Sequence, residues 1–284
     1  MTEVSARIAR LFAYPVKSCA GAELTEALVT ETGFDLDRAW MVVDESGEFV
    51  TQRELPRMAL VKTQFRRGEV ILRAPGMLAL HLQEDAVEGP AQVRVWNDTV
   101  AAYDMGDVAA QWFSDFLGRK SRLARFDPEC RRLSNLEWTG GVEAPNQFAD
   151  GYPLLVVSEA SLDLLNEKLA ARGVAAIGIE RFRPNIVLAG LEAHDEDRVS
   201  VLRIDTPEGE VRLALVKPCS RCTIPTVDPA TAEMNPAIND VLRTYRASER
   251  LGGAIAFAMN AIVLEGFDRI LRAGQRVTGD WDFA

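Results

Sequence analysis

Histidine is almost missing from this chain of 284 residues, which holds only His81, His194 and four cysteines. A structural zinc site needs about four Cys or His ligands in a closed tetrahedron, and neither histidine has a second ligand at the usual spacing. Four cysteines in a chain of this length also suit a reducing compartment better than a disulfide framework. Both a structural zinc site and a disulfide-stabilised fold are therefore disfavoured.

Long apolar runs and an excess of positive charge are missing as well. No apolar run approaches the roughly 20 residues that span a bilayer, and the start of the chain lacks the apolar segment of a secretory signal. The formal net charge of −10 argues against a nucleic-acid partner, because a phosphate backbone is bound by a surplus of Lys and Arg. These absences predict a folded cytoplasmic protein without a membrane segment.

The pattern along the chain predicts a mixed α/β fold that is rich in strands. Short strands separated by turn residues indicate a barrel or a curled sheet in the first hundred residues. These expected strands are residues 7–14, 27–30, 39–43, 48–51, 60–65, 70–73, 78–82 and 93–96. Later strands are expected at residues 185–189, 200–205, 211–216, 255–264 and 275–278.

Helical spacing of apolar residues appears at 107–117 and again at 158–169, where Ser158 and Ser161 suggest a capped start. A short helix is expected near residues 235–245. The stretch 127–150 is rich in Gly, Pro, Asn and Glu and has little periodicity. It predicts a long loop, which is either functional or a surface excursion.

The segment KPCSRCTIPTVDP, residues 217–229, places Cys219 and Cys222 three positions apart, between prolines and beside Lys217 and Arg221. These two cations would favour the thiolate, the form that binds soft metals and enters redox chemistry. A thioredoxin-like pair normally opens a helix, which the prolines that follow disfavour. One thiolate could instead serve a metal whose other ligands come from a cofactor. The alternative is two ordinary buried thiols in a loop.

Three further clusters place cations or small polar groups at predicted strand ends and turns. They are YPVKSCAG at 14–21 with Lys17 and Ser18, DLDRAW at 35–40 with Arg38, and ERFRPNIVLAG at 180–190 with Arg181, Arg183 and Asn185. Backbone N–H groups of such turns, together with Lys, Ser and Arg, are the groups that bind a phosphate ester. No Walker-type or dinucleotide glycine loop is present. A shared anionic ligand is therefore expected, and solvated cations or surface ion pairs are the alternative.

In their order along the chain, these motifs resemble those of proteins with a molybdenum cofactor sulfurase C-terminal (MOSC) domain. The likeness rests on YPVKSCAG, DLDRAW, VTQRELPRM (50–58), PLLVVSEASLDLLNEKL (153–169), RFRPNIVLAG and KPCSRCTIPTVDP. It covers nearly the whole chain and extends to the mitochondrial amidoxime-reducing component and its bacterial relatives. The resemblance implies an N-terminal β-barrel domain at residues 1–105 and a MOSC β-barrel with flanking helices at residues 106–284.

The resemblance also implies a pterin-type molybdenum cofactor, whose metal is held by the cofactor's own dithiolene and by one protein thiolate. That thiolate is assigned to Cys222, with Cys219 as the fallback. Position by position, cofactor contacts are assigned to Lys17, Ser18, Arg38, Asp150, Gly151, Arg183, Asn185, Ser220 and Arg221. At one point the chain departs from the family, because Gly151 and Tyr152 stand where a small hydroxyl residue is usual. Arg53 lies in a similar motif, with a carboxylate ion pair as its alternative role.

The activity implied by the resemblance is the reduction of an N-hydroxylated substrate, an amidoxime or a hydroxylamine. The metal accepts the oxygen, and two electrons and protons restore the centre. Asp228 is expected either to protonate the departing oxygen or to form a turn before Pro229. Because the chain has no four-cysteine [2Fe–2S] run, electrons are expected from a separate protein of the ferredoxin, flavin reductase or cytochrome b5 type.

Two other functions remain as alternatives at this stage. The first is a module that stores the cofactor or carries sulfur on a cysteine without substrate turnover. The second is a zinc-stabilised interaction protein.

Overall fold

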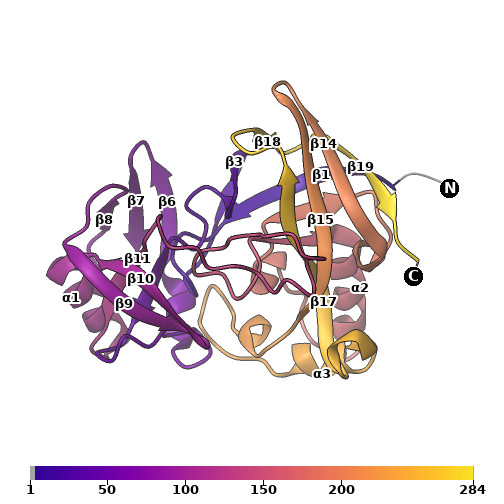
Figure 1. The fold of residues 1–284 in the computed structure, drawn as a ribbon. Coiled ribbons are helices and arrows are strands. Elements are labelled where there is room, and N and C mark those ends of the chain that lie inside the picture. The colour runs from indigo at the N-terminus through magenta and orange to yellow at the C-terminus, as the bar shows by residue number, and fades with distance from the viewer. Residues whose placement is uncertain (1–3, 284) are drawn as a thin grey trace.

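The computed structural model describes residues 4–283, which form two lobes side by side (Figure 1). The larger, which we call the barrel lobe, is a closed ring of seven strands. In ring order these are β12 (Leu154–Ser158), β13 (Ile186–Ala189), β1 (Val4–Ala13), β19 (Arg276–Trp281), β14 (Val199–Thr206), β15 (Gly209–Ser220) and β17 (Ala254–Glu265). The ring closes through β12 and β17, and all neighbours are antiparallel except β12 and β13.

Alternating apolar residues fill the interior of the barrel. Successive side chains of a strand point to opposite faces, so Val4 and Ile8 of β1 face the same core as Val211, Leu213 and Leu215 of β15. The outer face of the barrel is covered by α2 (Glu159–Ala170) and α3 (Ala237–Arg243), and their apolar residues form a second core with the strands. Burial of apolar surface on both faces is the main force that stabilises this lobe.

The other lobe, which we call the small lobe, combines two sheets with one helix. Its four-stranded sheet contains β5 (Trp40–Val43), β11 (Arg122–Phe126), β10 (Asp98–Asp104) and β9 (Gly89–Val95), and its three-stranded sheet contains β6 (Lys62–Arg66), β7 (Glu69–Arg73) and β8 (Leu80–Gln83). The helix α1 (Gly106–Leu117) buries Trp112, Phe113 and Phe116 against both sheets. It ends at Gly118, whose φ of 67° is easily adopted by glycine.

Short elements complete the chain. A further three-stranded sheet contains β18 (Ile270–Arg272), β3 (Glu26–Thr30) and β4 (Gly33–Phe34), while β2 (Ala22–Leu24) and β16 (Ala247–Ser248) extend the barrel sheet. The 3₁₀ turns are η1 (Pro56–Leu60), η2 (Ile179–Phe182), η3 (Asp195–Arg198), η4 (Ile224–Thr226) and η5 (Glu249–Leu251).

The predicted fold class, a β-rich α/β fold with a barrel and flanking helices, is confirmed. The helices expected at 107–117 and 158–169 are present, and Ser158 caps α2 by accepting a hydrogen bond from the Ser161 amide. Residues 127–153 contain no helix or strand, in agreement with the expected loop. The helix expected at 235–245 is shorter, as α3.

The strand predictions were wrong at several places. The strand expected at 48–51 is reduced to isolated bridges at Glu48 and Phe49. Seven strands were not expected. Four of them, β2, β4, β16 and β18, have only two or three residues. The others are β10 and β11, which contain alanine and charged residues of low strand preference, and β12, whose continuous apolar run has no alternation. Because β12 is buried on both faces, it lacks the period of two that identifies a half-exposed strand.

Lobe membership does not follow chain order. The strand β1 comes first in the chain but lies in the barrel, between β13 and β19. Helix α1 and strand β11 lie beyond residue 105, yet they pack in the small lobe. The domain boundary expected between residues 105 and 106 stays a prediction. Each lobe contains at least one element from the other side of this boundary.

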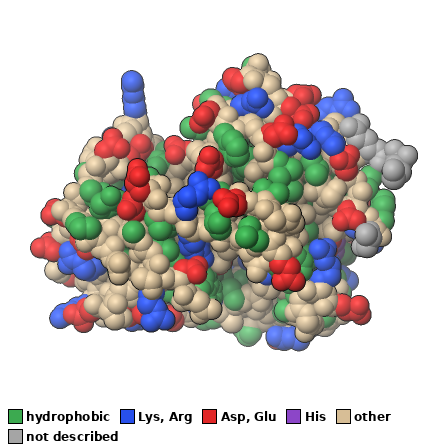
Figure 2. All heavy atoms as spheres, in the orientation of Figure 1, with side chains coloured by type: hydrophobic (Ala, Val, Ile, Leu, Met, Phe, Trp, Pro, Cys, Tyr) green, Lys and Arg blue, Asp and Glu red, His purple; other side chains and the backbone are tan. Residues whose placement is uncertain are grey.

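Two features bear on possible partners: the length and apolar character of the helices, and the distribution of charge on the surface. Within residues 4–283, no helix combines the length and the apolar character needed to cross a bilayer. Acidic and basic side chains are intermixed over the face in Figure 2.

A buried carboxylate ties α2 to the barrel. Glu196, in η3, is fully buried, and its Oε1 accepts a 2.7 Å hydrogen bond from the Ser161 hydroxyl. Its Oε2 has no hydrogen-bond partner within residues 4–283. Burial raises the pKa of Glu196 to about 7, and the neighbouring Asp197 carboxylate adds to the effect. The folded protein thus holds a proton that the unfolded chain releases above its ordinary pKa of 4.5.

We predict that Glu196→Gln becomes more stable relative to the wild type as pH rises. The contribution of Glu196 is fully present below pH 4.5 and is lost as pH rises through about 7. The difference in unfolding free energy should therefore grow from pH 5 to pH 8, by about 2–3 kcal/mol at 1.4 kcal/mol per pKa unit. Urea unfolding at both pH values measures it.

The pH dependence of the wild type alone would not isolate Glu196, because the contribution of His194 to stability depends on pH in the opposite direction. Burial lowers the pKa of His194 to about 3, with Arg246 and Lys168 adding to the effect, so its contribution is lost at low pH. His194 is present in both proteins and cancels in the difference. A difference that is constant with pH would mean that Glu196 is ionised in the folded protein.

Candidate functional site

One cavity is lined by both lobes and brings together residues that are far apart in the chain. Every residue expected to contact the cofactor or to bind the metal lies there: Lys17, Ser18, Arg38, Asp150, Gly151, Arg183, Asn185, Ser220, Arg221 and Cys222. Cys219, Tyr152 and Arg53 line it too. The lining comes from the segment after β1, the small lobe, the long loop and the end of β15. The structure thus assembles one site from the separate motifs.

An irregular end of β15 delivers the two cysteines to this cavity. The ladder between β15 and β17 shifts register near Lys217 and again after Pro218, where proline cannot donate a ladder hydrogen bond. After Cys222 the chain makes only the single 3₁₀ turn η4. The thioredoxin-like arrangement, with a thiol at the start of an α-helix, is therefore not present.

The two sulfurs have different surroundings. Arg221 directs its Nη1 to the Sγ of Cys219 at 3.0 Å, whereas the Sγ of Cys222 accepts only a long contact of 3.5 Å from the Ile224 amide. The Asn239 side chain fixes the Cys222 carbonyl at 3.0 Å. Cys222 therefore has the sulfur with fewer protein partners in the cavity.

The side chain of Lys217 was expected to lie beside the thiols, but it lies against aromatic rings instead. Its Nζ lies 5.1 Å from the ring centre of Trp138 and 5.8 Å from that of Tyr152, both in the long loop. The cation beside the cysteines is Arg221, and Lys217 holds the loop through its aromatic rings.

At another part of the cavity, two guanidinium groups stack on one tyrosine. Arg38 and Arg183 lie 4.5 and 4.3 Å from the ring centre of Tyr14. Arg38 also pairs with Asp37 and donates to the Asn185 side chain at 3.0 Å. Burial lowers the pKa of Arg183 to about 10, and the Arg38 cation adds to the effect. Two partly buried cations side by side create a positive region that favours an anionic ligand.

Three residues of the cavity adopt a left-handed backbone conformation that residues other than glycine rarely adopt. The φ angles are 66° for Ser18, 53° for Arg38 and 58° for Arg183. Such residues cost about 1–3 kcal/mol each and persist only where the surroundings hold them. Backbone hydrogen bonds do so here, from Arg38 to Tyr14 and from Arg183 to Glu180. Clustering of this backbone around one cavity is typical of a functional site.

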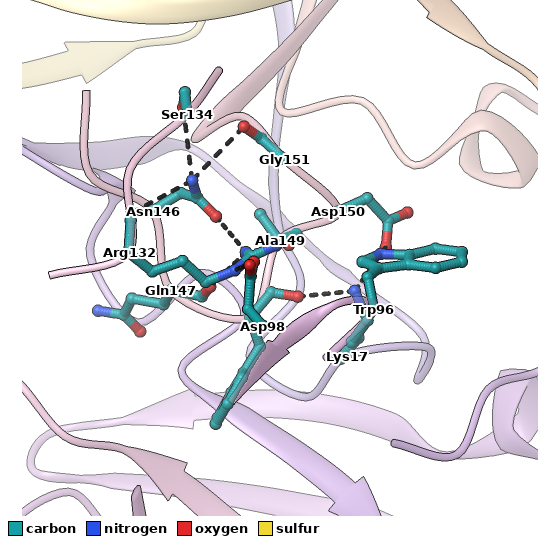
Figure 3. Close-up of polar contacts among 11 residues, drawn as sticks. Lys17, Trp96, Asp98, Arg132, Ser134, Asn146, Gln147, Ala149, Asp150 and Gly151 are labelled. Carbon is teal, nitrogen blue, oxygen red and sulfur yellow. Dashed lines mark hydrogen bonds and ion pairs between the residues drawn. The ribbon is translucent and has the colours of Figure 1, made fainter. Parts of the chain in front are cut away.

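Lys17 is buried in the cavity beside the long loop. It is 5% exposed and donates to the Phe148 carbonyl at 2.7 Å and to Asp150 Oδ1 at 2.5 Å. Burial lowers the pKa of Lys17, and the Asp150 carboxylate opposes the shift. The same Asp150 oxygen accepts a hydrogen bond of 3.1 Å from Trp96 Nε1 of the small lobe (Figure 3). Asp150 therefore connects the loop to both walls of the cavity.

The long loop has a rigid centre although it has no regular secondary structure. Arg132, 8% exposed, donates to the Asn146 side chain and to the carbonyls of Gln147 and Ala149, at 2.5–2.9 Å (Figure 3). Its Nε pairs with Asp98 of β10 at 2.7 Å. This network fixes the chain directly before Asp150, so the loop presents its cavity residues in one position.

Three donors in the cavity are buried without a hydrogen-bond acceptor. They are Arg183 Nη2, Arg221 Nε and the Tyr152 hydroxyl, none of which has a partner within residues 4–283. Buried polar groups are satisfied in most proteins, so unpaired donors that line a cavity indicate a polar ligand.

The expected catalytic role of Asp228 stays a prediction, and the structure shows its side chain engaged in other contacts. Its side chain does not line the cavity. Asp228 Oδ2 pairs with Arg181 Nη2 at 2.7 Å, and Oδ1 accepts from the Ala230 amide at 2.7 Å. Asp228 thus forms the turn that was its alternative role, and the carboxylate is occupied by a buried arginine.

Sequence reasoning missed several residues of the site. Tyr14 stood in the YPVKSCAG motif, but no role in the site was assigned to its ring. Trp96 lies in the turn between β9 and β10 with a φ of 57°. Asn260 of β17 lines the cavity and donates to the Lys217 carbonyl at 3.2 Å. Arg132 is one of two adjacent arginines, and nothing local distinguishes it from Arg131. Only the turn residues after Trp96 gave a signal.

Metal ligands supplied by the chain alone are too few for a closed site. No group of three or more His, Cys, Asp or Glu side chains within residues 4–283 is arranged to hold a metal ion. A metal bound at Cys222 would take its remaining ligands from elsewhere.

Comparison with known proteins agrees with the motifs. Residues 5–120 match the MOSC N-terminal beta barrel domain, and residues 143–278 match the MOSC domain. Mitochondrial amidoxime-reducing component 1 of Mus musculus is 36% identical over 79% of this chain and 66% of the mouse protein. Mitochondrial amidoxime reducing component 2 of Homo sapiens is 33% identical over 84% of this chain and 72% of its own length. The chain thus spans just under two thirds of the mouse protein.

Among solved structures, the YuaD protein of Bacillus subtilis is 13% identical over 98% of this chain and 96% of its own, with a TM-score of 0.40.

The loop network gives a prediction about stability. Arg132→Met should lower the unfolding free energy by about 2–4 kcal/mol, because it leaves several buried acceptors without a donor. It should also expose residues 127–153 to proteolysis. Urea unfolding and limited digestion with mapped cleavage sites measure both effects.

The matched control is Arg131→Met, which removes the adjacent arginine. Arg131 makes only loose contacts of 3.9 and 3.6 Å to exposed carboxylates, so its loss should change stability by less than about 0.5 kcal/mol. Equal effects of the two variants would show that the network does not hold the loop.

Proposed function

The chain belongs to the family of proteins that join a MOSC N-terminal β-barrel domain to a MOSC domain, and on this premise we propose that it is a molybdenum-cofactor-dependent reductase. Its substrates are N-hydroxylated compounds, amidoximes or hydroxylamines, from which it removes oxygen. The observation that supports this function best is the convergence of two thiols with the buried Lys17 and several partly buried arginines on one cavity. The names of the mouse and human relatives, amidoxime-reducing components, support amidoximes as substrates.

The residues of the cavity fit a pterin-type molybdenum cofactor. Such a group carries a soft metal that binds thiolate and a phosphate that binds cations. The cavity supplies Cys222 for the first and Lys17, Arg38 and Arg183 for the second. The unpaired donors of Arg183 and Arg221 are suited to its polar edges. When bound, the cofactor supplies the two-electron chemistry that removes the oxygen.

The protein's own residues would orient this group and control access to it. Cys222 is the proposed metal ligand, since its sulfur has only the weak Ile224 contact to give up. Arg221 is the proposed contact beside it, held by Cys219 and by the Phe182 carbonyl at 3.1 Å. Ser18, a buried residue, adds a hydroxyl group to the lining of the cavity.

Asn185 and the loop residues have a supporting part in this proposal. The Asn185 amide accepts from Arg38 and from the Leu155 amide and donates to the Phe12 carbonyl. It therefore orients Arg38 and contributes to the site through that residue. Asp150 and Gly151 also line the cavity, where Asp150 keeps Lys17 in place.

Electron supply is proposed to come from a separate electron-transfer protein of the ferredoxin, flavin reductase or cytochrome b5 type. We also propose a cytoplasmic location, because four cysteines without a disulfide suit a reducing compartment.

We predict that molybdenum and pterin co-purify with the protein near one equivalent each from a cofactor-producing host. Cys222→Ala should lose the metal and at least about 100-fold of the amidoxime reduction driven by a chemical electron donor, because the only proposed protein ligand is removed. Cys219→Ala should retain the metal. Elemental analysis, fluorescence of the oxidised pterin and product analysis measure these outcomes.

Cys130→Ala is the control, since Cys130 lies outside the cavity beside the core of the small lobe. Zinc in place of molybdenum, or no metal in any of the proteins, would overturn the proposal. Full loading without reduction of any N-hydroxylated compound would favour the cofactor carrier.

A further inference from the structure

Tyr152 has a hydroxyl for which the protein provides no acceptor. This residue lines the cavity together with both thiols, and its oxygen is shielded from solvent but has no hydrogen-bond partner within residues 4–283. A buried phenol normally finds a partner. The ligand of the cavity is the remaining source of an acceptor.

The barrel strands set the position of Tyr152 relative to the cysteines. Tyr152 directly precedes β12, whose Leu155 pairs with Asn260 of β17. Asn260 in turn pairs with Lys217 of β15, two residues before Cys219. The Lys217 ammonium lies 5.8 Å from the Tyr152 ring centre. Three adjacent strands thus place the phenol on the wall that leads to the thiols.

The charge state of Tyr152 distinguishes it from the other donors of the cavity. Burial raises the pKa of Tyr152 to about 12, so the hydroxyl keeps its proton near neutral pH. Lys17, Arg38 and Arg183 are placed for an anion, whereas a neutral donor suits a neutral oxygen. An N-hydroxylated substrate carries such an oxygen in its N–OH group.

We infer that the Tyr152 hydroxyl donates a hydrogen bond to the oxygen of the substrate's N–OH group and so selects substrates that carry this oxygen. The inference rests on the proposed function and extends it to a substrate contact. Tyr152 binds the leaving oxygen directly, and the bond is lost when the reduced product no longer carries it. This contact favours exchange of product for substrate.

The test uses two probes, each compared between wild type and variant. Benzamidoxime carries the N–OH oxygen and is neutral near pH 7, whereas benzamidine, its reduced product, lacks this oxygen and is a cation. The charge difference is the same for wild type and variant, so it cancels in the ratio of the two dissociation constants of each probe. Dissociation constants are measured by calorimetry on oxidised, cofactor-loaded protein without an electron donor, so that no turnover occurs. Tyr152→Phe should raise the dissociation constant of benzamidoxime about 3- to 10-fold, the effect of one hydrogen bond, and leave that of benzamidine unchanged.

Tyr245→Phe is the matched control. Tyr245 also has a shielded hydroxyl without a partner within residues 4–283, and burial raises its pKa to about 12. It lies outside the cavity, so the variant should change neither constant. Metal and pterin content of all three proteins is measured in parallel.

Several outcomes would overturn the inference. Equal weakening of both probes, or of neither, would exclude a contact to the oxygen. Loss of metal and pterin in Tyr152→Phe would show that the hydroxyl binds the cofactor. Wild-type protein that purifies without molybdenum and pterin would overturn the proposed function itself, whereas a loaded, active wild type with an unaltered Tyr152→Phe would overturn only the role of Tyr152.

Discussion

The hydrogen bonds of one buried amide hold the cavity together. Asn185, 1% exposed, accepts from Arg38 at 3.0 Å and from the Leu155 amide at 3.1 Å, and donates to the Phe12 carbonyl at 3.2 Å. It therefore joins β1, β12 and the start of β13 to the guanidinium of Arg38, which lies just before β5 of the small lobe. A hydrophobic residue could fill the same volume, but it could not orient the guanidinium. The barrel and the positive region of the site depend on this side chain together.

Burial of several cations in one cavity has a physical consequence for the folded state. Removing charge from water is costly unless a partner compensates, and Arg38 and Arg183 raise the cost because they repel each other. Asp37, Asp150 and the ring of Tyr14 offset part of it. An anionic ligand would offset more, and a ligand that binds only the folded protein stabilises it. Cofactor binding and folding are thus expected to be coupled.

Local patterns predicted what depends on neighbours in the chain. Ser158 and the apolar stripe behind it were sufficient for α2, and helical spacing of apolar residues was sufficient for α1. They failed where tertiary contacts decide. Strand β12 is buried on both faces and has no alternation, and the ion pair of Asp228 with Arg181, 47 residues earlier, has no local signal. The left-handed backbone of Ser18, Arg38 and Arg183 is likewise invisible in the sequence, because long-range packing imposes it.

The sequence by itself determined the chemical types available to the site: the paired thiols, the cations at turns, the lack of further metal ligands, and the motifs shared with the MOSC family. These are properties of residues and short segments, which the covalent chain carries unchanged. Only the tertiary structure decided that the segments share one cavity, that Arg221 rather than Lys217 faces a thiol, and that Tyr152 has an unpaired hydroxyl. The reason is that closure of the barrel sets these distances, and each distance joins residues whose separation in the chain gives no local signal.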